Sequence, residues 1–139
     1  MTKGLQESLF WFKERGKVRC DLCVQHCQIG EGKYGFCMVR KNIDGKLYSL
    51  NYGKVVAANI DNIERKPLFH FYPGSTTLSV ACSGPAHTSQ FSDVWQISHD
   101  QLPIVSVKDM TPEDIVDLAE KKDCKSITFT YIEPAIYGE

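Results

Sequence analysis

The alternation of hydrophobic and polar positions predicts short elements in the first half of the chain. Residues 5–12 are expected to form a short amphipathic helix, because their large apolar side chains fall on one stripe. Residues 42–45 end in Asp-Gly, a pair that tolerates the positive φ angles of a type I′ turn, and therefore predict a hairpin. Residues 47–50 and 54–60 are expected to be strands separated by a turn.

The second half of the chain has a different pattern. Residues 76–82 and 126–131 are rich in threonine and apolar side chains and predict two strands. Between them, Thr111 and Pro112 are typical of a helix start, with threonine as N-cap and proline at the first helical position. A strand, a helix and a strand in this order indicate a βαβ unit with parallel strands. We place a boundary near Pro73.

Composition and charge exclude several classes of protein. The 139 residues include 16 basic and 17 acidic side chains, so the net charge of −1 gives no overall sign of nucleic-acid binding. No apolar run approaches the roughly 18 residues that a membrane span needs. We recognise no secretory signal after Met1, so the protein is expected in the cytoplasm, where thiols stay reduced.

That compartment decides how the cysteines are interpreted. Cys20, Cys23, Cys27 and Cys37 follow the spacing Cys-x2-Cys-x3-Cys-x9-Cys, and a reduced cluster of this kind predicts a metal site. Thiolates favour zinc or iron–sulfur, and four of them complete the coordination of either a zinc ion or a [4Fe–4S] cluster. Both alternatives stay open. The two remaining cysteines, Cys82 and Cys124, are isolated in the sequence.

Two other features near the cysteines allow a structural and a functional interpretation. His26 is interpreted as a neighbour of the site or a surface residue and not as a ligand, since four cysteines already suffice. Basic residues around the cluster would offset the charge of bound thiolates. They would alternatively contact RNA, but no stacking aromatics are interleaved with them, so a small nucleic-acid-binding metal domain is the weaker alternative.

The cysteine segment and much of the chain after it resemble the radical-SAM enzymes of the AmmeMemoRadiSam system, relatives of the pyruvate formate-lyase activating enzymes. The motifs that carry the resemblance are Cys20-Asp21-Leu22-Cys23-Val24-Gln25-His26-Cys27, Gly35-Phe36-Cys37, Lys66-Pro67-Leu68, His70-Phe71-Tyr72-Pro73-Gly74, Trp95-Gln96-Ile97-Ser98 and Thr130-Tyr131-Ile132-Glu133-Pro134. The resemblance implies that residues 1–73 form a Cys-rich α+β segment. It also implies that residues 74–139 form a βαβ fragment of a radical-SAM-type partial (β/α) barrel.

The sequence departs from this family at its catalytic motif. The family holds a [4Fe–4S] cluster that cleaves S-adenosylmethionine with three cysteines after the first barrel strand. The matching positions here are Pro85, Ser89 and Ser92, and neither proline nor neutral serine replaces a soft thiolate. Cys82 and His87 lie nearby, but Cys82 is interpreted as a small buried strand residue.

The resemblance assigns Glu133 to the position where related enzymes contact the methionine end of S-adenosylmethionine. Cleavage of that molecule is not expected for this chain alone. We expect a truncated relative that binds a metal or cluster and acts as a structural or accessory subunit. The alternative is one part of a split radical-SAM enzyme that a partner chain completes. Either case predicts a homo-oligomer, or a partner that supplies the rest of the barrel.

Overall fold

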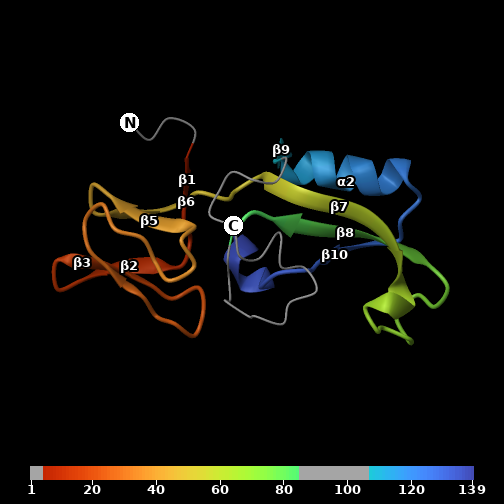
Figure 1. The fold of residues 1–139 in the computed structure, drawn as a ribbon, viewed down its shortest axis with the longest axis horizontal. Helices are drawn as coiled ribbons and strands as arrows, with labels where there is room; N and C mark the ends of the chain where they lie inside the picture. Colours follow the sequence, from red (N-terminus) through yellow and green to blue (C-terminus); the bar gives the residue numbers. More distant parts are fainter. Residues whose placement is uncertain (1–4, 85–106) are drawn as a thin grey trace.

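The computed structural model describes residues 5–84 and 107–139. In this part of the chain, ten strands lie in three sheets, together with one α-helix and two short 3-10 helices. The β5 sheet and the β3 sheet belong to the N-terminal part, and the β8 sheet carries the α-helix. Figure 1 shows the two N-terminal sheets on one side of the molecule and the β8 sheet with helix α2 on the other.

The β3 sheet begins as a hairpin. It has the order β2-β3-β4 and consists of β2 (Trp11–Glu14), β3 (Lys17–Cys20) and β4 (Gln28–Ile29), which are antiparallel. Arg15 and Gly16 turn the chain with φ angles of 48° and 75°. The helix expected over residues 5–12 is therefore wrong. Pairing of β2 with β3 satisfies backbone groups that a short isolated helix would have to satisfy alone.

The β5 sheet lies next to the β3 sheet. Its order is β1-β6-β5, all antiparallel, with β1 (Gln6–Glu7), β6 (Lys46–Ser49) and β5 (Arg40–Ile43). The predicted hairpin is confirmed, because Asp44 and Gly45 adopt φ angles of 53° and 70° between β5 and β6. Val18 of β3, Ile29 of β4 and Leu47 of β6 form one buried cluster, so the two sheets share a core.

The β8 sheet is mixed. Its order is β10-β8-β7-β9, with β10 (Ser126–Phe129), β8 (Thr76–Cys82), β7 (Lys54–Asn62) and β9 (Lys108–Asp109). β10 pairs with β8 in parallel, as expected, whereas β7 pairs with both β8 and β9 in antiparallel orientation. The 3-10 helix η1 (Ile63–Arg65) follows β7. Strands from before and after Pro73 therefore lie side by side in one sheet.

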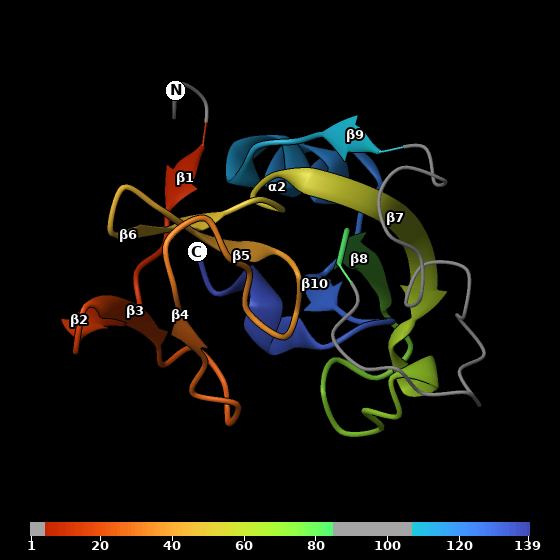
Figure 2. The same cartoon turned by 60° about the vertical axis from the view of Figure 1, so that its left-hand side comes forward.

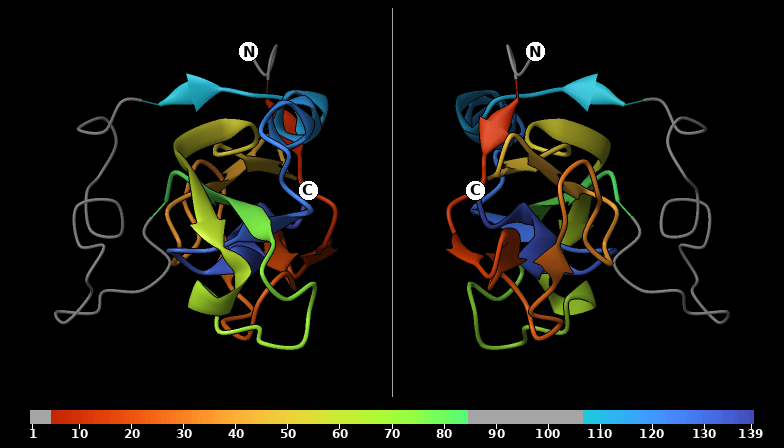
Figure 3. Two further views of the ribbon diagram at one scale, coloured as in Figure 1. Left: turned by 90° about the vertical axis from the view of Figure 1, so that its right-hand side faces the viewer. Right: turned by 90° about the vertical axis from the view of Figure 1, so that its left-hand side faces the viewer.

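Helix α2 (Pro112–Lys121) begins where the sequence predicts it. The Thr111 side chain accepts a hydrogen bond from the backbone of Asp114 at 3.2 Å, and the Asp114 side chain accepts one from the Thr111 backbone at 2.8 Å. Ile115 and Ala119 pack on β8. Figure 3 shows the helix end-on beside one face of the sheet.

The fold class expected from the sequence is wrong. The described chain is mostly β-sheet with one short helix, and it is not a βαβ fragment of a partial (β/α) barrel. The parallel pair β8 and β10 with helix α2 exists locally. The antiparallel β7, however, occupies the other edge of β8, where a barrel would require another parallel strand. The parallel pair β8 and β10 therefore belongs to a mixed, open sheet.

The 3-10 helix η2 (Pro134–Tyr137) connects the two halves. Figure 2 shows it between the N-terminal sheets and the β8 sheet. Ile136 of η2 and Val39, which precedes β5, form a small buried cluster of their own. Within the described residues, no helix has the length and apolar character that crossing a membrane would require.

Candidate metal site formed by four cysteines

The structure gathers the four clustered cysteines around one cavity of about 330 Å³. Cys20 ends strand β3 and is 6% exposed. Cys23 and Cys27 lie in the loop between β3 and β4, and Cys37 lies in the turn that precedes β5. Three peptide segments thus bring the four cysteine side chains to one cavity.

Backbone hydrogen bonds fix the loop that carries these thiols. The backbone N–H of Cys20 donates to the Cys27 carbonyl at 3.0 Å, and that of His26 donates to the Cys23 carbonyl at 3.2 Å. The Phe36 N–H donates to the Cys27 sulfur at 3.4 Å. This hydrogen bond joins the turn before β5 to the loop that carries Cys23 and Cys27.

Gly35 allows a close approach at one point of this wall. A Cβ atom on Gly35 would lie 3.2 Å from the Ile29 side chain and 3.8 Å from the Cys27 sulfur. The Gly35 N–H donates to the Arg40 carbonyl at 2.8 Å, and the Met38 N–H donates back to Gly35 at 3.0 Å. The turn that holds Cys37 is therefore packed directly against the loop that holds Cys27.

Burial and mutual proximity control the charge of the thiols. Loss of hydration raises the pKa of Cys20 and of Cys37 above the ordinary thiol value. The other cysteines raise both pKa values further, and the positive charge of Arg40 opposes them. In the absence of a bound cation these two sulfurs therefore favour the neutral thiol. A cation would displace the protons and stabilise the thiolates.

The arrangement matches a metal site in donor type and number. All four cysteines are free thiols, and soft sulfur donors are the ligands that zinc and iron–sulfur clusters use. In residues 5–84 and 107–139, however, no three His, Cys, Asp or Glu side chains converge in metal-binding geometry. The four thiols line the cavity without meeting at one point.

The C-terminal segment completes the cavity. Glu133, Ala135 and Ile136 form the wall that faces the cysteine loops, although they lie about a hundred positions away in the sequence. The Glu133 carboxylate accepts a hydrogen bond from the Ala135 N–H at 3.1 Å and so caps η2. The structure therefore brings Glu133, which the family resemblance assigns to cofactor binding, to the four cysteines.

Arg40 lines the site in a position that the sequence does not reveal. In the sequence, Arg40 is one of several basic residues near the cysteines. In the structure, its side chain is only 1% exposed. It donates hydrogen bonds to Ser49 at 3.1 Å and to Asn51 at 3.0 Å, and it forms an ion pair with the buried carboxylate of Glu139. Arg40 also lines the cysteine cavity.

His26 lies beside the site without lining the cavity. Its Nδ1 atom is 2.7 Å from the Asp21 carboxylate, and its side chain is half exposed. Asp21 also accepts a hydrogen bond from Arg19 at 3.0 Å. The hydrogen bonds from His26 and Arg19 hold the pKa of Asp21 below its ordinary value, and the hydrogen bond from His26 has the larger effect.

The positions that match the family's catalytic cysteines fall on Pro85, Ser89 and Ser92. They lie outside the described residues, as does His87. Cys82, the last residue of β8, is buried in the core between the sheet and α2. Burial raises its pKa to about 11, which is the behaviour of a structural thiol.

Comparison with known proteins adds one relative. The chain is 43% identical over 136 residues to a protein of Methanocaldococcus jannaschii described as uncharacterized protein MJ0808. The match covers 97% of this chain and 41% of that protein, so the chain spans well under half of the length of its relative. No family model matches the chain. No solved structure matches it either.

Proposed function

We propose that this chain binds a zinc ion or a [4Fe–4S] cluster through Cys20, Cys23, Cys27 and Cys37 and serves as a structural or accessory component. The observation that carries the proposal is that all four thiols line one cavity. Four soft donors are the complete ligand set of either group.

The two metals would contribute differently. A zinc ion with four thiolate ligands would stabilise the N-terminal sheets, because the binding free energy of a structural metal is also folding free energy. A [4Fe–4S] cluster would in addition accept or donate an electron. Retention of unoxidised thiols requires a reducing compartment, and we therefore place the protein in the cytoplasm.

We further propose that the chain is a relative of the radical-SAM enzymes without their cleavage activity. Support comes from the sequence motifs and from Pro85, Ser89 and Ser92 at the positions of the three family cysteines. None of these side chains is a ligand for iron in a cluster. The protein would then retain the N-terminal metal site but not the radical-generating site.

The second candidate is one part of an S-adenosylmethionine-dependent enzyme that another polypeptide segment completes. Two observations favour it. The relative in Methanocaldococcus jannaschii is more than twice as long as the matched region. In addition, Glu133 lines the same cavity as the four cysteines. The family resemblance assigns Glu133 to contact with the cofactor.

Anaerobic purification followed by metal and sulfide analysis tests the main proposal. We expect either one zinc per chain without colour, or iron and sulfide in equal amounts with a brown absorption. Incubation of the same protein with dithionite and S-adenosylmethionine should release no 5′-deoxyadenosine. Release that persists after replacement of the four cysteines by serine would reveal a second cluster and contradict the proposal that this chain lacks cleavage activity.

The remaining cysteines provide matched controls. Cys82→Ser and Cys124→Ser change the same chemical group outside the cavity, since both residues belong to the core beneath α2. Their metal content should equal that of the parent protein. Equal loss of metal from Cys124→Ser and Cys23→Ser would contradict the assignment of the ligands.

A further inference from the structure

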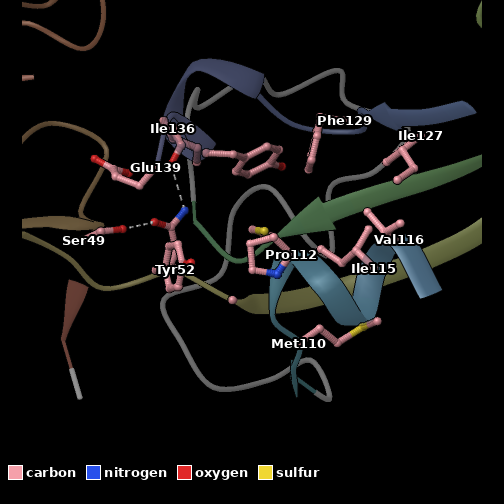
Figure 4. Close-up of a pocket in the computed structure, with 14 residues that line it drawn as sticks. Ser49, Tyr52, Met110, Pro112, Ile115, Val116, Ile127, Phe129, Ile136 and Glu139 are labelled. Atoms are coloured by element: carbon pink, nitrogen blue, oxygen red, sulfur yellow. Dashed lines mark hydrogen bonds between the residues drawn. The ribbon is translucent and has the colours of Figure 1, made fainter. Parts of the chain in front are cut away.

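The two faces of the β8 sheet differ in chemistry. One face packs against helix α2, and Figure 4 shows apolar side chains such as Ile115 and Ile127 around the cavity on this side. Thr128 follows Ile127 in β10, and successive side chains of a strand point to opposite faces. Thr128 lines another cavity, of about 470 Å³, which we call the polar cavity. In the described part of the chain, it shares no lining residue with the cysteine cavity.

Two stretches of the chain that are distant in the sequence form the wall of the polar cavity. The end of β7 and η1 with the residue after it contribute one carboxylate and two cations. The end of β10 and the residues after it contribute hydroxyl groups and an aromatic ring. The charged and hydroxyl-bearing residues of the wall are Asp61, Arg65, Lys66, Thr128, Thr130 and Tyr131.

The carboxylate of this wall, that of Asp61, is already engaged. Its Oδ2 atom accepts hydrogen bonds from Lys66 at 2.6 Å, from Ser79 at 2.7 Å and from Tyr131 at 2.9 Å. Its Oδ1 atom lies 3.7 Å from the Arg65 guanidinium. A carboxylate accepts a limited number of hydrogen bonds, so Asp61 has little left to offer a ligand. A cationic ligand would also have to compete with Lys66.

The two cations outnumber the carboxylate, so the wall carries a surplus of one positive charge. The Lys66 side chain is only 10% exposed, and its charge is therefore fixed in the wall. The Arg65 side chain is 76% exposed, and among the described residues its one charged contact is that with Asp61, beyond hydrogen-bond distance. The guanidinium N–H groups of Arg65 are thus free to bind an anion, and their planar arrangement matches two oxygens of a phosphate or carboxylate.

The two residues that follow β10 complete the wall. The Thr130 N–H donates to the Val80 carbonyl at 3.0 Å and so fixes this residue, while the Thr130 hydroxyl has no hydrogen-bond partner within the described residues. Tyr131 has a φ of 70°, which is rare for a residue with a large side chain. Its ring packs against the Lys66 ammonium, 4.9 Å from the ring centroid. Backbone strain that side-chain contacts maintain is frequent at ligand-binding sites.

We propose that the polar cavity binds a small molecule through an oxyanion group, phosphate or carboxylate, which Arg65 and Thr130 contact. The guanidinium donates two hydrogen bonds to the oxyanion, the Thr130 hydroxyl donates one, and Lys66 supplies a fixed positive charge. The volume lies within the range of about 300–1,000 Å³ that is usual for small-molecule sites, so the cavity has room for more than the oxyanion group. This site is independent of metal binding at the cysteines.

Phenyl phosphate, benzoate and benzyl alcohol are suitable probes, because each carries one aromatic ring and only the first two are anions. Titration of the ¹⁵N-labelled full chain with the anions should shift the amide signals of Lys66, Thr130 and Tyr131 saturably. Benzyl alcohol should bind at least about tenfold more weakly, because hydrogen bonds to charged groups are the stronger ones. Tighter binding of phenyl phosphate identifies a phosphate site, and tighter binding of benzoate identifies a carboxylate site.

Variants test the location of the site. Arg65→Gln should weaken anion binding by about tenfold or more, and Thr130→Val, which removes only the hydroxyl, by roughly twofold to tenfold. The matched control is Arg15→Gln, which removes the same charge in the turn between β2 and β3 and should bind like the parent. The proposal is overturned if neither anion gives saturable shifts, if benzyl alcohol binds as tightly as the anions, or if Arg65→Gln or Thr130→Val binds like the control.

Discussion

The guanidinium group of Arg40 donates a hydrogen bond to the backbone carbonyl of Ile136 at 3.0 Å, across a separation of 96 positions in the sequence. Arg40 starts strand β5, and Ile136 lies in η2, so this bond joins the N-terminal sheets to the C-terminal segment. The same carbonyl also accepts a hydrogen bond from Asn51 at 3.2 Å. Two buried side chains, Arg40 and Asn51, therefore hold the part of the cysteine cavity wall that η2 provides.

Replacement of Arg40 should be strongly destabilising. Arg40→Met would leave the Glu139 carboxylate buried without its partner, since the two side chains are 1% and 3% exposed. Loss of one member of a buried ion pair costs about 3–5 kcal/mol. Urea unfolding measures this free energy.

The exposed pair of Lys46 and Glu7 is the control, because its side chains are 52% and 42% exposed. Lys46→Met should cost far less than Arg40→Met, because exposed ion pairs contribute little to stability. Similar losses in both variants would show that Arg40 is not a buried connection between the two halves.

Asp61 should make the stability of the β8 sheet depend on pH below 4. Hydrogen bonds from Lys66 at 2.6 Å and Ser79 at 2.7 Å, in this order of importance, lower the pKa of Asp61 to about 2. The folded pKa lies below the unfolded value, so the stabilisation is complete above about pH 4 and is lost as the pH falls toward 2.

Asp61→Asn should therefore lose about 1–2 kcal/mol at neutral pH and show a flatter dependence between pH 4 and 2. Asp123→Asn is the matched control, since the Asp123 side chain is 90% exposed. Thermal unfolding at several pH values would detect the difference. An unchanged slope in Asp61→Asn would contradict the role of the Lys66 hydrogen bond.

Some of this structure follows from local sequence. The hairpin at Asp44 and Gly45, strand β8 and the start of α2 at Thr111 are all where the sequence predicts them, because turn residues and helix caps act within a few positions. The spacing of the cysteines predicts a shared metal site, and the four side chains do line one cavity; that they bind a metal together stays a prediction.

Other features depend on partners that are distant in the sequence. Residues 5–12 carry a helical stripe, but residues 11–14 form β2, since β3 offers a partner strand. Likewise, Leu78 is only 1% exposed because α2 packs over it. No local pattern shows that Arg40 meets Glu139, or that Glu133 faces the cysteines. These contacts arise from tertiary packing alone.

Loss of a single cysteine ligand should reduce both metal content and stability. We expect Cys23→Ser to bind less metal than the parent and to unfold at a lower temperature, because metal binding contributes to folding of the N-terminal sheets. Cys124→Ser should match the parent in metal content. Differential scanning calorimetry combined with metal analysis would check both, and equal metal content in Cys23→Ser and the parent would refute the site.

Strand β10 should mediate self-association or binding of a partner chain. It forms an edge of the β8 sheet, and Phe129 on it is 47% exposed. Sedimentation velocity at micromolar concentration should show an assembly larger than a monomer. Phe129→Lys should dissociate it, whereas Phe69→Lys, the same change at a side chain that is 60% exposed elsewhere, should not. A monomeric parent protein without a partner in solution would argue against this interface.

X-ray absorption at the metal edge of anaerobically purified protein tests the central claim most directly. We predict a first shell of four sulfur neighbours per zinc at about 2.3 Å, or an iron shell made of sulfur alone with iron–iron scattering. The quadruple variant Cys20→Ser, Cys23→Ser, Cys27→Ser and Cys37→Ser should contain no such metal. A first shell of oxygen or nitrogen, or an unchanged sulfur shell in the quadruple variant, would contradict the account.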